Sequence, residues 1–234
     1  MLVGLSIPIL IGRLIGGLLG LTIHEFAHAW TAVRLGDTTP IYQSAPPTRL
    51  FGGRLVMGGR GRLTLDPRAH IDPLGFLLLM LVGFGWAHPV PVSTRNFYPN
   101  EQRGLMLVAL AGPITNLVQA FVFGGLLRFF LEIGLFSETS FMAEILASIV
   151  ILNIVLFLFN LVPLSPLDGW KILLGLLPAE QSWNLRRYEQ ESTFALVLIL
   201  MVGVLNPNFN VIWLILGPIA RLLFSLTTGG VVFY

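Results

Sequence analysis

Long apolar runs separated by polar joints define the chain. The runs cover residues 14–33, 73–87, 104–131, 141–164 and 193–226, and Asn206-Pro207-Asn208 divides the last run into two pieces. An apolar helix needs about 17–25 residues to cross a bilayer, and most of these runs lie in or near that range. The pattern predicts an all-α polytopic membrane protein with four to six transmembrane helices.

The run 73–87 is the exception. It has only 15 residues, fewer than the roughly 17–25 that a spanning helix requires. Arginine-containing joints flank it on both sides. Because basic flanks tend to stay on the same side of a membrane, we predict that this run enters the bilayer and returns. It would form a re-entrant or interfacial element between the first two core spans.

The stretch 34–72 is polar and irregular, and glycines divide it into short pieces. The composition of two of these pieces, 54–57 and 62–65, favours short strands. We therefore predict a small β-hairpin or edge sheet in this stretch, beside the helices.

The composition excludes an ordinary soluble protein. Charged residues make up 11% of the 234 residues and hydrophobic residues 55%, whereas soluble domains carry about 25% charged residues. The net charge of +2 is too small to indicate nucleic-acid binding, and the absence of cysteine excludes a disulfide framework or a thiolate metal site. The simplest organisation is one membrane-embedded domain over 1–234, with a core over 14–175 and a C-terminal helical hairpin over 193–227.

Cations are distributed unevenly between the joints. The joints after the first and fourth apolar runs are basic, and six arginines lie between positions 34 and 68. The joint 132–140 carries Glu132 and Glu138 and no cation. The positive-inside rule then predicts a protein of the plasma or inner membrane whose basic joints face the cytoplasm.

The sequence His24-Glu25-Phe26-Ala27-His28 lies toward the predicted cytoplasmic end of the first run. On a helix, residues four apart share one face, so both imidazoles could hold Zn²⁺ while Glu25 takes a proton from metal-bound water. The alternative is a pair of core histidines and a glutamate bonded to a neighbouring helix. Burying three such groups in a membrane without a partner is costly, which favours the metal.

Two histidines leave a zinc site incomplete, and Asp168 is the best candidate for the third ligand. It follows the 141–164 run at the predicted level of the histidines, after two prolines that break the helix, Pro163 and Pro166. Two histidines and a carboxylate keep one position open for water, which is typical of catalytic zinc. Asp168 could instead cap a new helix that begins near Gly169.

A third group of residues, Ala111-Gly112-Pro113-Ile114-Thr115-Asn116, lies near the predicted cytoplasmic start of its span. Small residues permit close approach of helices, and Asn116 offers an amide at the depth of the metal. Packing alone would also explain Gly112 and Pro113, and Asn116 could bond to another helix. Both interpretations stay open.

Together these motifs resemble the site-2 protease family of intramembrane zinc metalloproteases. The resemblance rests on HEFAH, AGPITN and NLVPLSPLDG, and RLTLDPRAHIDPLG and GWAHPVPV are similar to the short branch without a PDZ domain. It implies one zinc ion per chain and these site residues: His24, His28 and Asp168 as ligands, Glu25 as catalytic base, and Asn116 and Asn160 as polar groups that help to stabilise an oxyanion. Two departures are the stretch 44–60, which resembles an insertion, and His88, where a lysine is expected.

The implied reaction is hydrolysis of peptide bonds in or near transmembrane segments of membrane proteins, as in regulated intramembrane proteolysis. A transmembrane protein substrate and the lipid bilayer are the expected partners, and the oligomeric state stays open. We expect an unwound substrate to add as a strand to the edge of the 54–65 hairpin. The 193–226 pair is a candidate lateral gate.

Two other functions are compatible with the same residues. One is a divalent-metal transporter that uses the His and Asp cluster as a transit site. The other is a catalytically idle relative that only binds membrane partners. For His70 and His88, a surface or interfacial position is the simpler interpretation.

Overall fold

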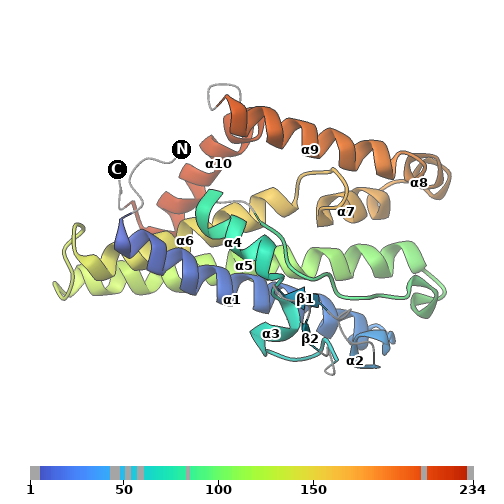
Figure 1. Cartoon of the computed structure of the whole chain (residues 1–234), viewed down its shortest axis with the longest axis horizontal. Helices are drawn as coiled ribbons and strands as arrows, with labels where there is room; N and C mark the ends of the chain where they lie inside the picture. The colour runs from blue at the N-terminus through green and yellow to red at the C-terminus, as the bar shows by residue number, and fades with distance from the viewer. Residues whose placement is uncertain are drawn as a thin grey trace.

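Three long helices form the core of the protein. The computed structural model describes residues 6–42, 48–50, 54–56, 61–82, 85–206 and 210–230. Helices α1 (Ile7–Arg34), α5 (Glu101–Glu132) and α6 (Phe141–Asn160) pack against one another (Figure 1). The other elements, in chain order, are α2 (Thr39–Tyr42), β1 (Thr48–Leu50), β2 (Arg54–Val56), α3 (Pro67–His70), α4 (Pro73–Val82), η1 (Thr94–Phe97), α7 (Asp168–Leu176), α8 (Ala179–Arg186), α9 (Glu189–Leu205) and α10 (Val211–Thr228).

The core helices begin at capping side chains. Ser6 accepts a hydrogen bond from a backbone N–H in the first turn of α1, and Asn100 and Ser140 do the same for α5 and α6. Such caps satisfy backbone donors that have no partner within the helix. The polar residues between the apolar runs therefore set where the core helices start.

Four helices of the described part are long and apolar enough to cross a membrane, namely α1, α5, α6 and α10. Helices α8 and α9 are bent by 63° relative to each other and would form a fifth span if they act as one broken segment. These findings agree with an all-α polytopic core. The organisation as one domain with a C-terminal hairpin stays a prediction.

The β part of the predicted fold class is wrong, because helices build the core of the described residues. Residues 62–65, predicted as a strand, form bends and loop. The Arg62 N–H donates instead to the Pro40 carbonyl of α2 at 2.6 Å, so this run bonds to α2 rather than to a partner strand. Among the described residues of the stretch, strand pairing is limited to the three-residue segments β1 and β2. We expected an unwound substrate to add as a strand to the edge of a 54–65 hairpin, and this expectation falls together with the predicted hairpin.

Glycines bring α1 and α6 into close contact. They recur every four residues along α1, at Gly12, Gly16 and Gly20. A Cβ at Gly12 would stand 2.5 Å from Ser148 Cβ on α6. Small residues at this spacing let two membrane helices approach where larger side chains would separate them. The same four-residue spacing continues along α1 to the two histidines of the HEFAH motif.

The run predicted to re-enter the membrane forms α4, a helix of ten residues. Its last turn is bonded to α1, because Arg13 Nη1 donates to the Met80 carbonyl at 3.1 Å. Ile71 and Ala87, which flank α4 on either side, form an antiparallel β-bridge. The two flanks therefore lie side by side, as a re-entrant segment requires, and α4 is shorter than a membrane span.

The two C-terminal helices pack differently. Helix α10 lies against α5 and α6, where Ala220 joins a buried apolar cluster with Val150. Helix α9 lies apart from this core for much of its length (Figure 1). It is bonded near its start to the loop between α6 and α7, since the Ser165 N–H donates to Ser192 Oγ at 3.0 Å. The gating role of this pair stays a prediction.

Candidate metal centre

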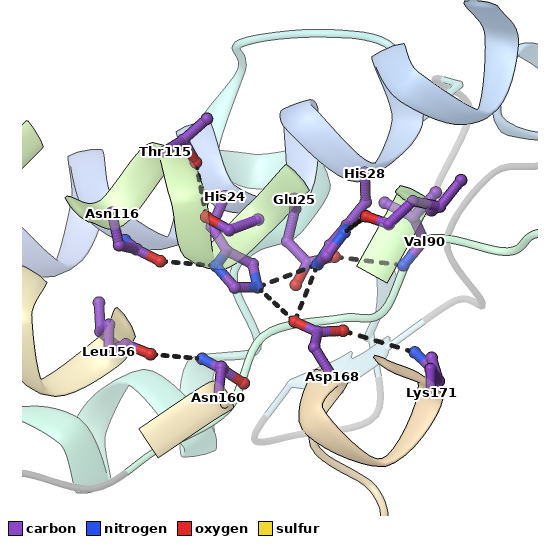
Figure 2. A network of polar contacts seen from close by, with 12 residues as sticks. His24, Glu25, His28, Val90, Thr115, Asn116, Leu156, Asn160, Asp168 and Lys171 are labelled. Atoms are coloured by element: carbon purple, nitrogen blue, oxygen red, sulfur yellow. Dashed lines mark hydrogen bonds and ion pairs between the residues drawn. The ribbon is translucent and has the colours of Figure 1, made fainter. Parts of the chain in front are cut away.

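The HEFAH motif lies in the C-terminal half of α1 and is buried in the protein. His24, Glu25 and His28 are 5%, 8% and 7% exposed, respectively. Polar atoms buried to this extent need partners inside the protein. Helical spacing of four residues points both imidazoles toward α5 and α7, where those partners lie (Figure 2).

Hydrogen bonds fix the tautomer of each imidazole. His28 Nδ1 lies 2.7 Å from the Val108 carbonyl oxygen, and His24 Nδ1 lies 2.6 Å from Asn116 Oδ1. Carbonyl oxygens only accept, so Nδ1 carries the proton in both rings. Nε2 of each neutral ring is therefore bare and offers a lone pair. This is the form in which histidine binds a metal ion.

The orientation of the Asn116 amide is itself determined. Asn116 Nδ2 donates to the Gly20 carbonyl and to Asn153 Oδ1, each at 3.1 Å. Asn153 Nδ2 donates in turn to the Ile149 carbonyl at 3.0 Å. The chain ends on carbonyls that can only accept, so its direction has one solution. Asn116 thus contacts the Nδ1 side of the His24 ring and also bonds α6 through Asn153, so its contacts fit both interpretations, support of the metal site and a bond between helices.

Asp168 completes a triangle of possible ligand atoms. Its Oδ2 lies 3.1 Å from His24 Nε2 and 3.1 Å from His28 Nε2, and the two Nε2 atoms are 3.0 Å apart (Figure 2). Each atom presents lone pairs, and one proton could bridge only one pair of them, whereas a shared metal ion would satisfy all three. Ligands at about 2.0–2.1 Å from a tetrahedral zinc ion stand roughly 3.3 Å apart. The donor atoms and their spacing therefore fit zinc.

Gly112 of α5 leaves room beside these atoms. A Cβ at this position would lie 2.5 Å from His28 Nε2 and 2.6 Å from His24 Nε2. Any side chain at Gly112 would therefore press on the two bare nitrogens. Helix packing was the simpler interpretation of Gly112, but the atoms that a side chain here would meet first belong to the two imidazoles.

Asp168 reaches the triangle from the first turn of α7. The residue at the helix cap is Leu167, and the Asp168 carboxylate turns to the imidazoles instead of capping α7. Lys171, one turn along, has its Nζ 3.7 Å from the second carboxylate oxygen, Oδ1. The ammonium group attracts Oδ1 and leaves Oδ2 to face the histidines (Figure 2).

Glu25 lies beside the triangle. Carboxylate and imidazole ligand atoms of His24, Glu25 and His28 lie within 4.8 Å of one another, and they form a group that could hold a metal ion. Glu25 Oε2 accepts a hydrogen bond from the Val90 N–H at 3.2 Å. Because Val90 lies outside α1, a second segment of the chain helps to fix the position of the Glu25 carboxylate.

Other predicted residues lie outside the triangle. Asn160 Nδ2 donates to the Leu156 carbonyl at 3.0 Å, one turn back on α6, so its catalytic role stays a prediction (Figure 2). His70 is fully buried and bonds a backbone carbonyl through Nε2, so its surface interpretation is wrong. Burial lowers the pKa of the His70 imidazole. His88 Nε2 lies 3.5 Å from Asp72 Oδ2.

Three contributors to the site were missed in the sequence. They are Asn153, the Val108 carbonyl and Lys171. Asn153 had a signal, because it is one of two amides inside the apolar run 141–164, where polar side chains are costly and tend to be functional. The Val108 carbonyl had none, since every residue has a backbone carbonyl.

Comparison with known proteins agrees with this geometry. The chain is 35% identical over 195 residues to a Bacillus subtilis (strain 168) protein named "Putative zinc metalloprotease YwhC", and the match covers 82% of this chain and 80% of that protein. The chain belongs to this zinc metalloprotease family. The resemblance to site-2 proteases that lack a PDZ domain is thereby confirmed.

Further relatives of the family carry similar names. "Putative zinc metalloprotease Rip2" of Mycobacterium tuberculosis (strain ATCC 25618 / H37Rv) is 30% identical over 203 residues, which are 83% of this chain and 67% of that protein. "Putative zinc metalloprotease MJ0611" of Methanocaldococcus jannaschii is 34% identical over 101 residues, which are 43% of this chain and 49% of that protein. No protein-family model and no solved structure matches the chain.

Proposed function

We propose that this chain is an intramembrane zinc endopeptidase of the site-2 type. It hydrolyses peptide bonds in or near transmembrane segments of membrane proteins, with one zinc ion per chain. The observation that carries the proposal is the convergence of His24 Nε2, His28 Nε2 and Asp168 Oδ2 within 3.1 Å of one another, beside the buried Glu25. Three lone-pair donors and an adjacent carboxylate are what metal-assisted hydrolysis needs.

The residues divide the work of hydrolysis. His24, His28 and Asp168 would hold zinc, which when bound makes water more acidic and polarises a carbonyl group. Glu25 accepts a proton from the attacking water and passes it to the leaving amine. The Val90 N–H holds Glu25 Oε2 in position for this transfer. Burial among helices keeps bulk water away and strengthens each electrostatic contact.

Asn116 and Asn160 have different parts in this proposal. Asn116 keeps the proton of His24 on Nδ1, so that Nε2 stays available. Asn160 has one amide N–H engaged with the Leu156 carbonyl. Its other N–H is a candidate donor to an oxyanion.

The proposed setting is the plasma or inner membrane, with the site toward the cytoplasm. Support comes from the arginines that follow α1 and from the acidic joint between α5 and α6. Helices α1, α5 and α6, which surround the site, are all long and apolar enough to span a bilayer. The substrate is a transmembrane protein that reaches the site through the lipid.

A direct test compares the wild type with Glu25→Gln in detergent. We expect zinc content to be unchanged and cleavage of single-span substrates to fall by about 10²–10⁴-fold, the usual contribution of a general base. Glu138→Gln, in the exposed joint after α5, is the matched control and should cleave normally. Cleavage that survives in Glu25→Gln would refute the proposed function. So would zinc flux into proteoliposomes without any proteolysis, which is the behaviour of a transporter.

A further inference from the structure

Arg62 is an unusually buried charge in the loop before α3. It is 1% exposed, and it is among the largest fully buried side chains of the described residues. Arginine is almost never buried completely unless its charge and donors are used.

The backbone at Arg62 is firmly held. Its N–H donates to the Pro40 carbonyl at 2.6 Å. A side chain at the preceding residue, Gly61, would collide with the Ile41 carbonyl. The chain thus passes close to the end of α2, and the Arg62 side chain is directed inward from a fixed starting point.

The guanidinium group joins two segments that are far apart in sequence. Nη1 donates to the Ala69 carbonyl in α3, and Nη2 donates to the Pro89 carbonyl at 3.2 Å. Pro89 immediately precedes Val90, whose N–H bonds Glu25 Oε2. Arg62, Pro89 and Val90 therefore connect directly to the carboxylate of the base.

The charge of Arg62 has one clear counterpart. Its two backbone contacts are neutral carbonyls, and its Nε is buried without a partner among the described residues. Burial lowers the pKa of Arg62, and attraction to the Glu25 carboxylate acts in the opposite direction. A neutral donor could satisfy the carbonyls equally well, whereas a cation also stabilises a nearby buried carboxylate.

We propose that Arg62 is a positioning residue for Glu25, which it serves by clamping Pro89 so that the Val90 N–H meets the carboxylate. The inference rests on the proposed peptidase function. Arginine suits this task because its planar fork reaches two acceptors at once, whereas lysine offers a single charged point.

The test measures cleavage, zinc content and amide exchange in Arg62→Gln and Arg62→Lys. We expect kcat to fall by about 10–100-fold in Arg62→Gln, with KM and zinc content close to wild type. Arg62→Lys keeps the charge but loses the fork, so its kcat should lie between the two. Hydrogen exchange at the Val90 amide should accelerate in both variants, because the Glu25 bond is weakened.

Arg68→Gln is the matched control. Arg68 lies six positions along the same stretch, but its side chain is 81% exposed and bonds Asp66 on the surface. Its kcat and zinc content should equal those of the wild type. An inactive wild type would refute the proposed function and not this inference.

Three outcomes would overturn the inference when the wild type is active. One is a wild-type kcat in Arg62→Gln. Another is loss of zinc in parallel with kcat, which indicates general unfolding of the site. If Arg62→Gln does not fold, Arg62→Lys decides, and wild-type kcat with wild-type Val90 exchange in that variant overturns the clamp.

Discussion

The metal ligands and the catalytic base occupy two sides of one site that are built differently. On the ligand side, His24, His28 and Asp168 project from regular helices, and the groups behind the two imidazoles belong to α5. On the base side, Glu25 also projects from α1, but its hydrogen-bond partner, Val90, belongs to non-helical chain.

We therefore expect zinc affinity and proton transfer to depend on separate parts of the molecule. Helix spacing and helix packing determine the ligand side, so local changes there should alter metal binding. A few long-range bonds to irregular chain determine the base side. Changes there should alter turnover while leaving the metal in place.

The largest effect is expected from Gly112→Ala. The added methyl group would stand 2.5–2.6 Å from the two Nε2 atoms, so zinc content and proteolysis should both fall to background, as measured by mass spectrometry and substrate cleavage. Gly125→Ala, on the same helix, is the control, because a Cβ there meets nothing within 4 Å. Normal zinc affinity in Gly112→Ala would show that the ligand side has been located wrongly.

The next effect comes from the amides behind His24. Asn116→Leu leaves the Nδ1 proton without an acceptor, and we expect zinc affinity to fall by about 10–100-fold in a chelator competition assay. Asn153→Leu should have a smaller effect of the same sign. Asn160→Leu should leave zinc affinity unchanged, because that amide bonds the Leu156 carbonyl. Equal losses in all three variants would remove the distinction between them.

Sequence alone predicted the ligand side more completely than the base side. Helical periodicity relates His24 to His28 directly, and the prolines before Asp168 showed where a carboxylate could turn inward. Those are short-range properties of the chain. Asp168 was the best candidate for the third ligand, but helix capping stayed open as its alternative role, because its contact with α1 spans about 140 positions.

The strand predicted on the base side, over residues 62–65, was wrong for a physical reason. The run from Arg62 to Leu65 has the composition of a strand, but strand formation needs a partner with free backbone groups. Here the Arg62 N–H bonds the Pro40 carbonyl, and the buried guanidinium takes carbonyls of two other segments. Glycine-rich composition predicted that the stretch is irregular, but not which long-range bonds order it.

A moderate effect is expected from Lys171→Met. Lys171 lies 3.7 Å from Asp168 Oδ1 and is 43% exposed, so solvent screens much of its attraction. We expect zinc affinity to fall by about two- to fivefold, the range of a partly exposed ion pair. Lys171→Arg retains the cation and should bind zinc almost normally. If Lys171→Met binds zinc more tightly, the ammonium group competes with the metal for the carboxylate.

The smallest effect on the site should come from Asp37, a buried carboxylate that ties α1 to the chain following the base side. Burial raises its pKa, but hydrogen bonds from Thr39, Ser93 and Asn96 outweigh this and lower it. Because the folded-state pKa is depressed, the contribution of Asp37 to stability is fully present above about pH 4 and is lost as pH falls through the folded value.

Asp37→Asn should therefore reduce the free energy of unfolding by about 1–3 kcal/mol at neutral pH. The gap from the wild type should narrow in acid, as measured by denaturant unfolding in detergent at several pH values. Zinc affinity at neutral pH should change little. A difference in free energy of unfolding between the two proteins that stays constant from neutral to acidic pH would contradict the assigned charge of Asp37.

The most direct test of the central claim is zinc X-ray absorption on the purified wild type and on Asp168→Ala. We expect one zinc ion per chain in the wild type, with nitrogen and oxygen ligands at about 2.0–2.1 Å and an imidazole signature. Asp168→Ala should lose most of its zinc or show a ligand replaced by solvent. Full zinc occupancy with an unchanged ligand shell in Asp168→Ala would contradict the account.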